Sequence, residues 1–132
     1  MNEEAIGFWS RALKTIQSAK LLLPTDPDSS ASRAYYSAFY AVSALFAIKG
    51  ITFSKHSALE AAVHRDLVKP GLWSIELGED YSALLEMRAT GDYGILEHIS
   101  ESNAKKAIES AHRILQAVHK AHPDVFSHSG EI

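Results

Sequence analysis

The sequence predicts an all-α protein, an up-and-down antiparallel bundle of four to five helices. Apolar residues recur at three- and four-residue intervals through most of the chain, and no strand-like alternation persists over a useful length. Short segments rich in proline, glycine and serine separate the periodic stretches, as expected for neighbouring antiparallel helices. The length of 132 residues suits one domain with one core. We expect the bundle over 1–123 and a flexible tail over 124–132.

The first two helices are predicted on either side of a proline-rich break. The first covers 3–23, and Pro24–Pro27 ends it. The second, over 30–49, is apolar nearly all round, which is typical of a helix at the centre of a bundle or at a subunit interface. Its apolar surface leads us to expect a homodimer. Three side chains could cap its start: Asp28, Ser29 and Ser30.

Three further helices follow. One is predicted over 55–69, with Ser54 as its cap, and another over 76–89. Gly91 then introduces a flexible turn. The last helix is predicted over 101–121, where the apolar stripe is almost heptad-spaced.

The composition excludes several classes of protein. The formal net charge is −3, so no global positive field would hold bulk duplex nucleic acid. The absence of cysteine excludes a disulfide scaffold and a thiolate zinc site, and it suits the cytoplasmic location that we expect. The N-terminus is acidic where a signal peptide would be basic, and no apolar run reaches the roughly 18 residues of a membrane helix. We therefore expect no membrane partner.

A first polar constellation lies on the second helix. Arg33, Tyr36 and Tyr40 are spaced i, i+3 and i+7, so they share one face. A guanidinium beside two phenols can stack a base and hold a phosphate. The alternative is that both tyrosines pack in the bundle with their hydroxyls hydrogen-bonded.

A second constellation, Lys55, His56 and Ser57, opens the third helix. The start of a helix offers free N–H groups and a partial positive charge, which suit an anion, and two basic side chains would add to this. The alternative is a capping segment with solvated side chains.

A third constellation joins Arg88 to Asp92 and Tyr93 across the glycine-rich turn. An arginine–aspartate pair can lock such a turn, and this would be a structural role. The same groups could bind a phosphate or assist proton transfer. His112, His119 and His122 follow on the last helix, but no carboxylate completes a zinc motif there, so we predict neither a metal nor another cofactor.

These motifs agree, in order, with a known family. The run Arg33 to Tyr36, the Lys55–Ser57 segment, Leu67–Gly71, and Arg88 followed by Asp92-Tyr93 together resemble the HEPN domain family, closest to its small stand-alone prokaryotic branch. The resemblance implies a helical bundle, commonly dimeric, that is associated with nucleotide and RNA binding. Many members are metal-independent ribonucleases, and others are toxins paired with a nucleotidyltransferase antitoxin.

One feature of the family's nucleases is absent at the matching position. They carry an arginine, four to six residues, and a histidine, whereas the same spacings after Arg88 lead here to Tyr93, Gly94 or Ile95. Asp92 and Tyr93 take the place of the histidine. A solvated aspartate is a weak base for a ribose hydroxyl.

Three hypotheses follow. The first is a nucleotide- or single-stranded-RNA-binding protein, the toxin-like half of a pair with a nucleotidyltransferase-type antitoxin. Its predicted binding residues are Arg33, Tyr36, Tyr40, Lys55, His56 and Ser57. The second is a divergent metal-independent ribonuclease with Arg88, Asp92 and Tyr93 as its catalytic residues. The third is a non-catalytic interaction scaffold in which Arg88 and Asp92 form a structural clamp.

Overall fold

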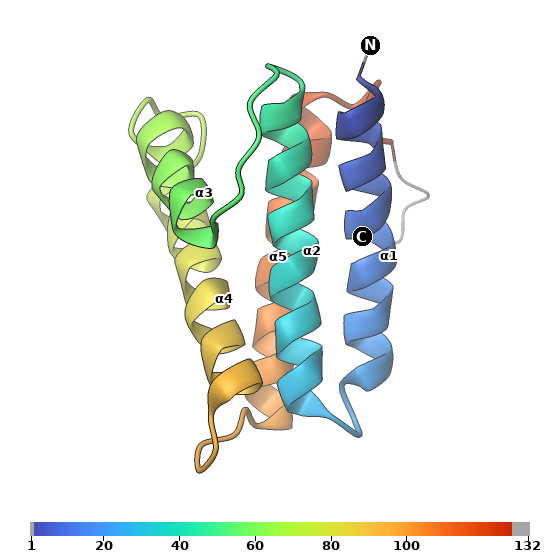
Figure 1. Ribbon diagram of the computed structural model, residues 1–132, viewed down its shortest axis with the longest axis vertical. Coiled ribbons are helices and arrows are strands. Elements are labelled where there is room, and N and C mark those ends of the chain that lie inside the picture. Colours follow the sequence, from blue (N-terminus) through green and yellow to red (C-terminus); the bar gives the residue numbers. More distant parts are fainter. Residues whose placement is uncertain (1, 128–132) are drawn as a thin grey trace.

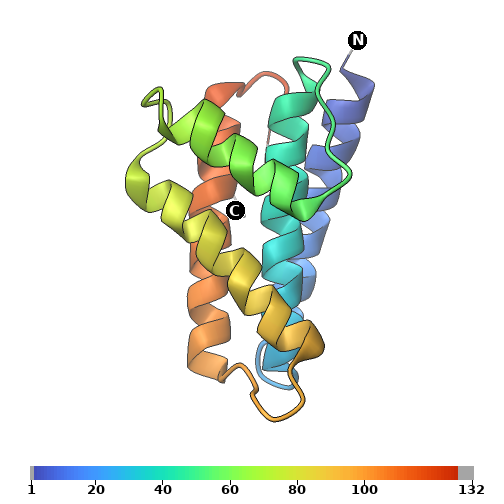
Figure 2. The same ribbon diagram turned by 60° about the vertical axis from the view of Figure 1, so that its left-hand side comes forward.

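The computed structural model describes residues 2–127, which form five α-helices, one π-helical segment and no strand. Three long helices stand side by side, and α3 and α4 cross one side of them (Figures 1 and 2). This confirms the predicted all-α bundle. The elements are α1 (Glu3–Leu22), α2 (Pro27–Ala47), α3 (His56–Ala62), the π-helical η1 (Val63–Val68), α4 (Ile75–Tyr93) and α5 (Glu101–Ala121).

Small residues allow α1 and α2 to approach closely. The hydroxyls of Ser30 and Ser37 donate to the carbonyls of Ala19 and Ala12, both at 2.7 Å. These pairs step by seven residues in opposite directions, as antiparallel helices require. Alanines and serines fill this face of α2, and all are fully buried: Ser30, Ala34, Ser37, Ala41 and Ala44.

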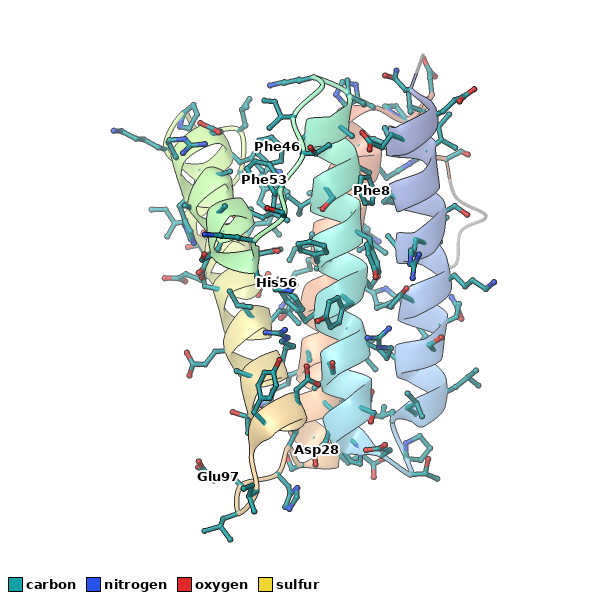
Figure 3. The ribbon with its side chains drawn as sticks, viewed as in Figure 1. Phe8, Asp28, Phe46, Phe53, His56 and Glu97 are labelled. Carbon is teal, nitrogen blue, oxygen red and sulfur yellow. The ribbon has the colours of Figure 1, made fainter. Side chains whose placement is uncertain are left out.

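The second helix begins earlier than predicted. Pro27 is its first residue, where a missing N–H costs nothing, and Asp26 caps it by accepting from the Ser29 amide at 3.2 Å. The predicted caps were therefore wrong. Asp28 instead accepts from the amide of Ile99 at 2.7 Å and contacts His98 at 2.8 Å, and these bonds lower its pKa. Asp28 thus ties the α4–α5 connection to the start of α2 (Figure 3).

The third predicted helix is divided in two. His56–Ala62 is α-helical, and Val63–Val68 widens into a π-helical segment. Lys55, not Ser54, occupies the cap position, without a side-chain hydrogen bond, so the predicted cap was wrong. The π-helical segment packs closely on Gly78 of α4, where a β-carbon would lie 2.7 Å from Val68 Cγ2.

Part of the expected tail packs against the bundle. Phe126 is fully buried beside Trp9, with the two ring centres 5.4 Å apart. The Trp9 indole donates to the carbonyl of Ser127 at 2.7 Å. The prediction of a flexible tail was therefore wrong for 124–127, because Phe126 supplies an apolar anchor. Residues 128–132 of the predicted tail lie outside the described residues.

The apolar surface of α2 is covered by other helices of the same chain. It packs against α1, α4 and α5, and thirteen of its residues are buried. This central position removes the sequence argument that its apolar surplus requires a second copy. Across residues 2–127, no helix combines the length and apolar character needed to cross a membrane.

Candidate functional site

Arg88 projects from α4 towards α2 and is mostly buried, with 14% of its side chain exposed. Its Nη2 donates to the hydroxyl of Tyr36 at 3.2 Å and reaches that of Tyr93 at 3.5 Å. The guanidinium carbon also lies 5.6 Å from the ring centre of Tyr36 and 5.5 Å from that of Tyr93. Two phenols therefore hold the charge in position.

Asp92 gives Arg88 a nearby negative charge but no hydrogen bond. Arg88 Nε lies 3.2 Å from Asp92 Oδ2, one helical turn away. The N–H is misaligned, so Nε is the sole buried side-chain nitrogen or oxygen without a hydrogen-bond partner in residues 2–127. Burial alone would lower the pKa of Arg88, but the Tyr36 hydrogen bond and the surrounding negative groups outweigh it and raise that pKa. The arginine is charged, and one donor remains to be satisfied.

His56 at the start of α3 joins the site from the other side. Its Nδ1 lies 2.6 Å from the hydroxyl of Tyr35, which accepts from the Tyr81 hydroxyl at 3.5 Å. Burial, followed by the charge of Arg88, lowers the pKa of His56, so its imidazole is neutral near pH 7. If Tyr35 donates to Nδ1, the hydroxyl protons of both Tyr35 and Tyr81 have acceptors, and Nε2 carries the imidazole proton. His56 then offers an N–H donor.

The rings of Tyr35 and Tyr36 contact both His56 and Arg88. The His56 ring centre lies 5.5 Å from that of Tyr35 and 5.7 Å from that of Tyr36. The Arg88 guanidinium lies 5.8 Å from the Tyr35 ring centre. Burial raises the pKa of Tyr35 to about 12, so this phenol keeps its proton. We call the following residues the Arg88 cluster: Tyr35, Tyr36, His56, Arg88, Asp92 and Tyr93.

A line of stacked cations and phenols continues from the Arg88 cluster to α1. Arg33 lies 4.8 Å over the Tyr36 ring, and Arg11 lies 5.1 Å over that of Tyr40. The two tyrosine ring centres are 6.2 Å apart. Beyond them, Arg11, Arg33 and Lys14 line a polar groove of about 430 Å³ between α1 and α2, and no acidic residue lines it. Positive charge thus extends past the cluster on a chain whose net charge is negative.

The structure brings most of the predicted site residues together. Arg88, Asp92, Tyr93, Tyr36 and His56 meet directly or across one ring. Arg33 and Tyr40 extend the same surface through Tyr36. Lys55 and Ser57 flank His56 in the chain but are exposed. Within residues 2–127, neither makes a hydrogen bond or ion pair with Arg88.

The expected flexible turn between Arg88 and Tyr93 is instead the last turn of α4. The prediction was wrong because Gly91 serves close packing rather than flexibility. A β-carbon there would lie 2.7 Å from the carbonyl oxygen of Asp28 at the start of α2. The helix therefore sets the Arg88–Asp92 spacing, and Gly91 allows the two helices to approach.

Sequence analysis missed Tyr35, Tyr81 and Arg11. Tyr35 lies beside Tyr36 in the chain and is four residues from Phe39, so its position on a buried face was visible in the sequence. Its hydrogen bond to His56 was not, because that bond joins residues 21 positions apart. Arg11 gave no local signal, since its aromatic partner is on another helix.

The histidines in and just after α5 are not gathered with other potential metal ligands in residues 2–127. Residues 2–127 contain no group of three or more histidine, cysteine or acidic side chains arranged to hold a metal ion. His119 donates from Nδ1 to the carbonyl of Phe126 at 2.5 Å, which helps to fix the segment after α5. This is a structural role rather than ligation.

Fold and site together define a helical bundle with a buried, arginine-centred polar cluster. The sequence matches the HEPN domain over residues 7–121. It is 43% identical over 125 residues to a UPF0332 protein of Thermotoga maritima, covering 93% of this chain and 95% of that one. The chain belongs to the HEPN domain family.

Two more distant relatives agree with this membership. The protein named Putative toxin MJ0142 of Methanocaldococcus jannaschii is 29% identical over 111 residues, which cover 83% of this chain and 76% of that one. A UPF0332 protein of Gloeobacter violaceus is 28% identical over 118 residues, which cover 88% and 94% of the two chains.

Proposed function

We propose that the protein is a toxin-like, cytoplasmic HEPN protein that binds single-stranded RNA or a nucleotide at the Arg88 cluster. One observation carries the proposal: Arg88 is mostly buried and charged, yet its Nε makes no aligned hydrogen bond, although Asp92 Oδ2 lies 3.2 Å away. A phosphate oxygen is an acceptor suited to this donor, and arginine is the side chain that most often recognises phosphate through paired donors. The neutral His56, which contacts the same two tyrosine rings as Arg88, supplies a further N–H donor.

The groove between α1 and α2 favours RNA over a mononucleotide. Its three cations lie beyond the phosphate that Arg88 would hold, and two of them, Arg11 and Arg33, stack on the rings of Tyr40 and Tyr36. Single-stranded nucleic acid is bound by basic grooves combined with aromatic rings. Each additional phosphate neutralised makes binding more sensitive to salt. A chain of several nucleotides would therefore use more of this surface than one nucleotide can.

A binding titration with a matched arginine control tests the proposal. We expect a fluorescein-labelled 12-nucleotide RNA to bind saturably, with Arg88→Gln weakening it about tenfold or more, the cost of losing a charged hydrogen bond. Arg113→Gln is the control, because Arg113 also pairs with an aspartate, Asp80 at 2.9 Å, but on another part of the bundle. Equal effects of the two substitutions, or no saturable binding, would contradict the proposal. Loss of melting temperature in Arg88→Gln without any binding to lose would support the scaffold hypothesis.

The hydrogen bonds of the cluster favour binding over RNA cleavage. A ribonuclease needs a base for the ribose 2′ hydroxyl. When the Tyr35 hydroxyl donates to His56 Nδ1, that nitrogen is not available as a base. Asp92, the other candidate, faces Arg88. Incubation of RNA with the protein and a chelator distinguishes the two functions. Cleavage that disappears in Arg88→Gln would establish the divergent ribonuclease instead.

A second copy of the chain is the partner that we propose for the end of α4. Ile95 and Leu96 are 86% and 93% exposed, directly after the Tyr93 of the cluster. Large apolar side chains exposed together favour an interface. We expect a homodimer by light scattering, and a monomer when both residues are changed to aspartate. A monomeric unmodified protein at micromolar concentration would contradict this; a nucleotidyltransferase-type antitoxin would then be the partner to test on the same segment.

A further inference from the structure

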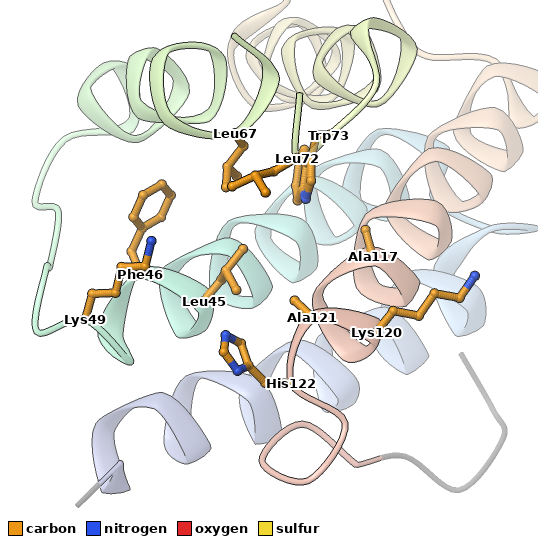
Figure 4. Close-up of a pocket in the computed structure, with 10 residues that line it drawn as sticks. All are labelled: Leu45, Phe46, Lys49, Leu67, Leu72, Trp73, Ala117, Lys120, Ala121 and His122. Carbon is orange, nitrogen blue, oxygen red and sulfur yellow. The ribbon is translucent and has the colours of Figure 1, made fainter. Parts of the chain in front are cut away.

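A second candidate site lies at the opposite end of α2, in a cavity of about 540 Å³ (Figure 4). It shares no residue with the Arg88 cluster, and its size is typical of pockets that bind small molecules. Its floor is apolar. We call it the Trp73 cavity, and its lining residues are Leu45, Phe46, Lys49, Leu67, Leu72, Trp73, Ala117, Lys120, Ala121 and His122.

The polar side chains of the Trp73 cavity are three basic residues and an indole. Lys49, Lys120 and His122 stand around the apolar floor, and no acidic residue is among the lining. Figure 4 shows the Trp73 nitrogen and the Lys49 amine on the cavity side, whereas Lys120 extends away from the centre. The lysines and the indole can only donate hydrogen bonds. The cavity therefore lacks a fixed negative charge and presents donors for an acceptor.

Lys49 has no ion pair within residues 2–127, although an acid lies within electrostatic reach. That acid is Asp66, whose two oxygens are already held by Arg65 at 2.8 and 2.9 Å. The Trp73 indole N–H likewise has no hydrogen-bond partner within residues 2–127. Its nitrogen is not fully buried, so a ligand can reach it. Both donors line the cavity, Lys49 from the end of α2 and Trp73 from the segment that precedes α4.

We propose that the Trp73 cavity binds a small apolar carboxylate, with its hydrocarbon body on the apolar floor and its carboxylate at Lys49 and the Trp73 indole. The donors match a carboxylate, and the floor matches an aliphatic chain or an aryl ring. This site is independent of the proposed RNA function.

The position of the Trp73 cavity disfavours a ligand with more than one negative charge. The cavity lies where α2 and α5 end, at Ala47 and Ala121. Helix C-termini carry partial negative charge, which disfavours a phosphate dianion more than a carboxylate. Lysines at helix ends also complement that partial charge, but this structural role gives no reason for an indole N–H that lines the same cavity without a partner in residues 2–127. The two lysines can therefore be separated by experiment.

Calorimetric titration with decanoate tests the site, using decanol and decyltrimethylammonium as probes of the same length. We expect decanoate to bind with at least tenfold higher affinity than either, and to shift the Trp73 indole N–H resonance, assigned with Trp73→Phe. Lys49→Gln should weaken decanoate about tenfold and leave decanol unchanged. Lys120→Gln, the matched control whose amine points away, should change it less than about threefold.

The opposite results would overturn the proposal. No saturable decanoate binding by the unmodified protein is one such result, and equal binding of decanoate and decyltrimethylammonium is another. Ala117→Leu fills the cavity and should remove binding of both decanoate and decanol while the protein stays folded by circular dichroism. Binding that survives in this folded variant would place the ligand elsewhere and reject the site.

Discussion

The two sides of α2 are built in opposite ways. The fully buried strip that packs on α1 carries alanine and serine, and its hydroxyls donate to α1 carbonyls at 2.7 Å. The side facing α3 and α4 carries large rings, which contact the guanidinium of Arg88 from α4 and the neutral imidazole of His56 from α3. Every hydroxyl named on the first side is satisfied, whereas a buried N–H on the second has no acceptor. The first side serves stability, and the second keeps free hydrogen-bonding capacity for function.

The largest expected effect is on the α1 side of this comparison. Ala12→Leu adds three carbons at a position with no exposed surface, whose carbonyl accepts from Ser37. Overpacking of this kind costs about 1–3 kcal/mol of the free energy of unfolding. Urea denaturation measures it. The control is Ala58→Leu on α3, where the site is exposed and stability should change by less than about 0.5 kcal/mol. Equal changes would show that the α1–α2 contact is less tight than described.

A smaller effect is expected where α4 itself comes close to α2. Gly91→Ala would place a β-carbon 2.7 Å from the Asp28 carbonyl oxygen, a backbone atom that cannot turn aside. We expect a loss of about 1–2 kcal/mol and weaker RNA binding, because the end of α4 carries Asp92 and Tyr93. Gly7→Ala is the matched control: it lies in α1 with nothing within 4 Å of the new carbon.

The control should change stability in the opposite direction. Alanine restricts the unfolded chain and favours a helix, so Gly7→Ala should stabilise the protein by about 0.5–1 kcal/mol. If both glycine substitutions stabilise it, α4 can shift away from α2, and the spacing of the Arg88 cluster is not fixed by Gly91. Thermal unfolding of the two variants at one pH decides this.

Sequence reasoning succeeded where a signal repeats along one helix. The 3.6-residue pattern predicted the helices, and the last of them, predicted over 101–121, is α5 (Glu101–Ala121), which Ser100 caps. It failed where a residue has two meanings. Gly91 indicates flexibility in isolation, but close packing next to Asp28 explains it. Asp28 indicates a cap, but a bond to Ile99, 71 positions away, explains it.

The candidate site shows the same limit. Arg88 and Asp92 were expected to pair across a flexible turn, whereas they lie one helical turn apart within α4. His56 and Tyr35 belong to different helices, and only the packing of α3 on α2 brings them within 2.6 Å. The family motif lacks its histidine after Arg88, yet the fold places another histidine across the same two tyrosines. A linear motif cannot describe such an arrangement, because it records order along one helix only.

The smallest expected effect is on the pH dependence of stability, which should differ between the two sides of α2. Burial and Arg88 lower the pKa of His56 in the folded protein, so the unfolded chain, with a pKa near 6.5, binds a proton more readily. This contribution to stability is complete above the unfolded pKa and declines as pH falls through 6.5 towards the folded value. His56→Gln keeps an acceptor for Tyr35 but cannot titrate. Between pH 7.5 and pH 5.5 its melting temperature should therefore fall less than that of the unmodified protein, by up to a few degrees.

A Ser37→Ala variant on the α1 side should keep the full pH dependence, since its lost hydroxyl bond does not involve a proton equilibrium. If His56→Gln and the unmodified protein show the same slope, His56 is not held neutral beside Arg88, and the donor that we assign to its Nε2 is removed from the binding site.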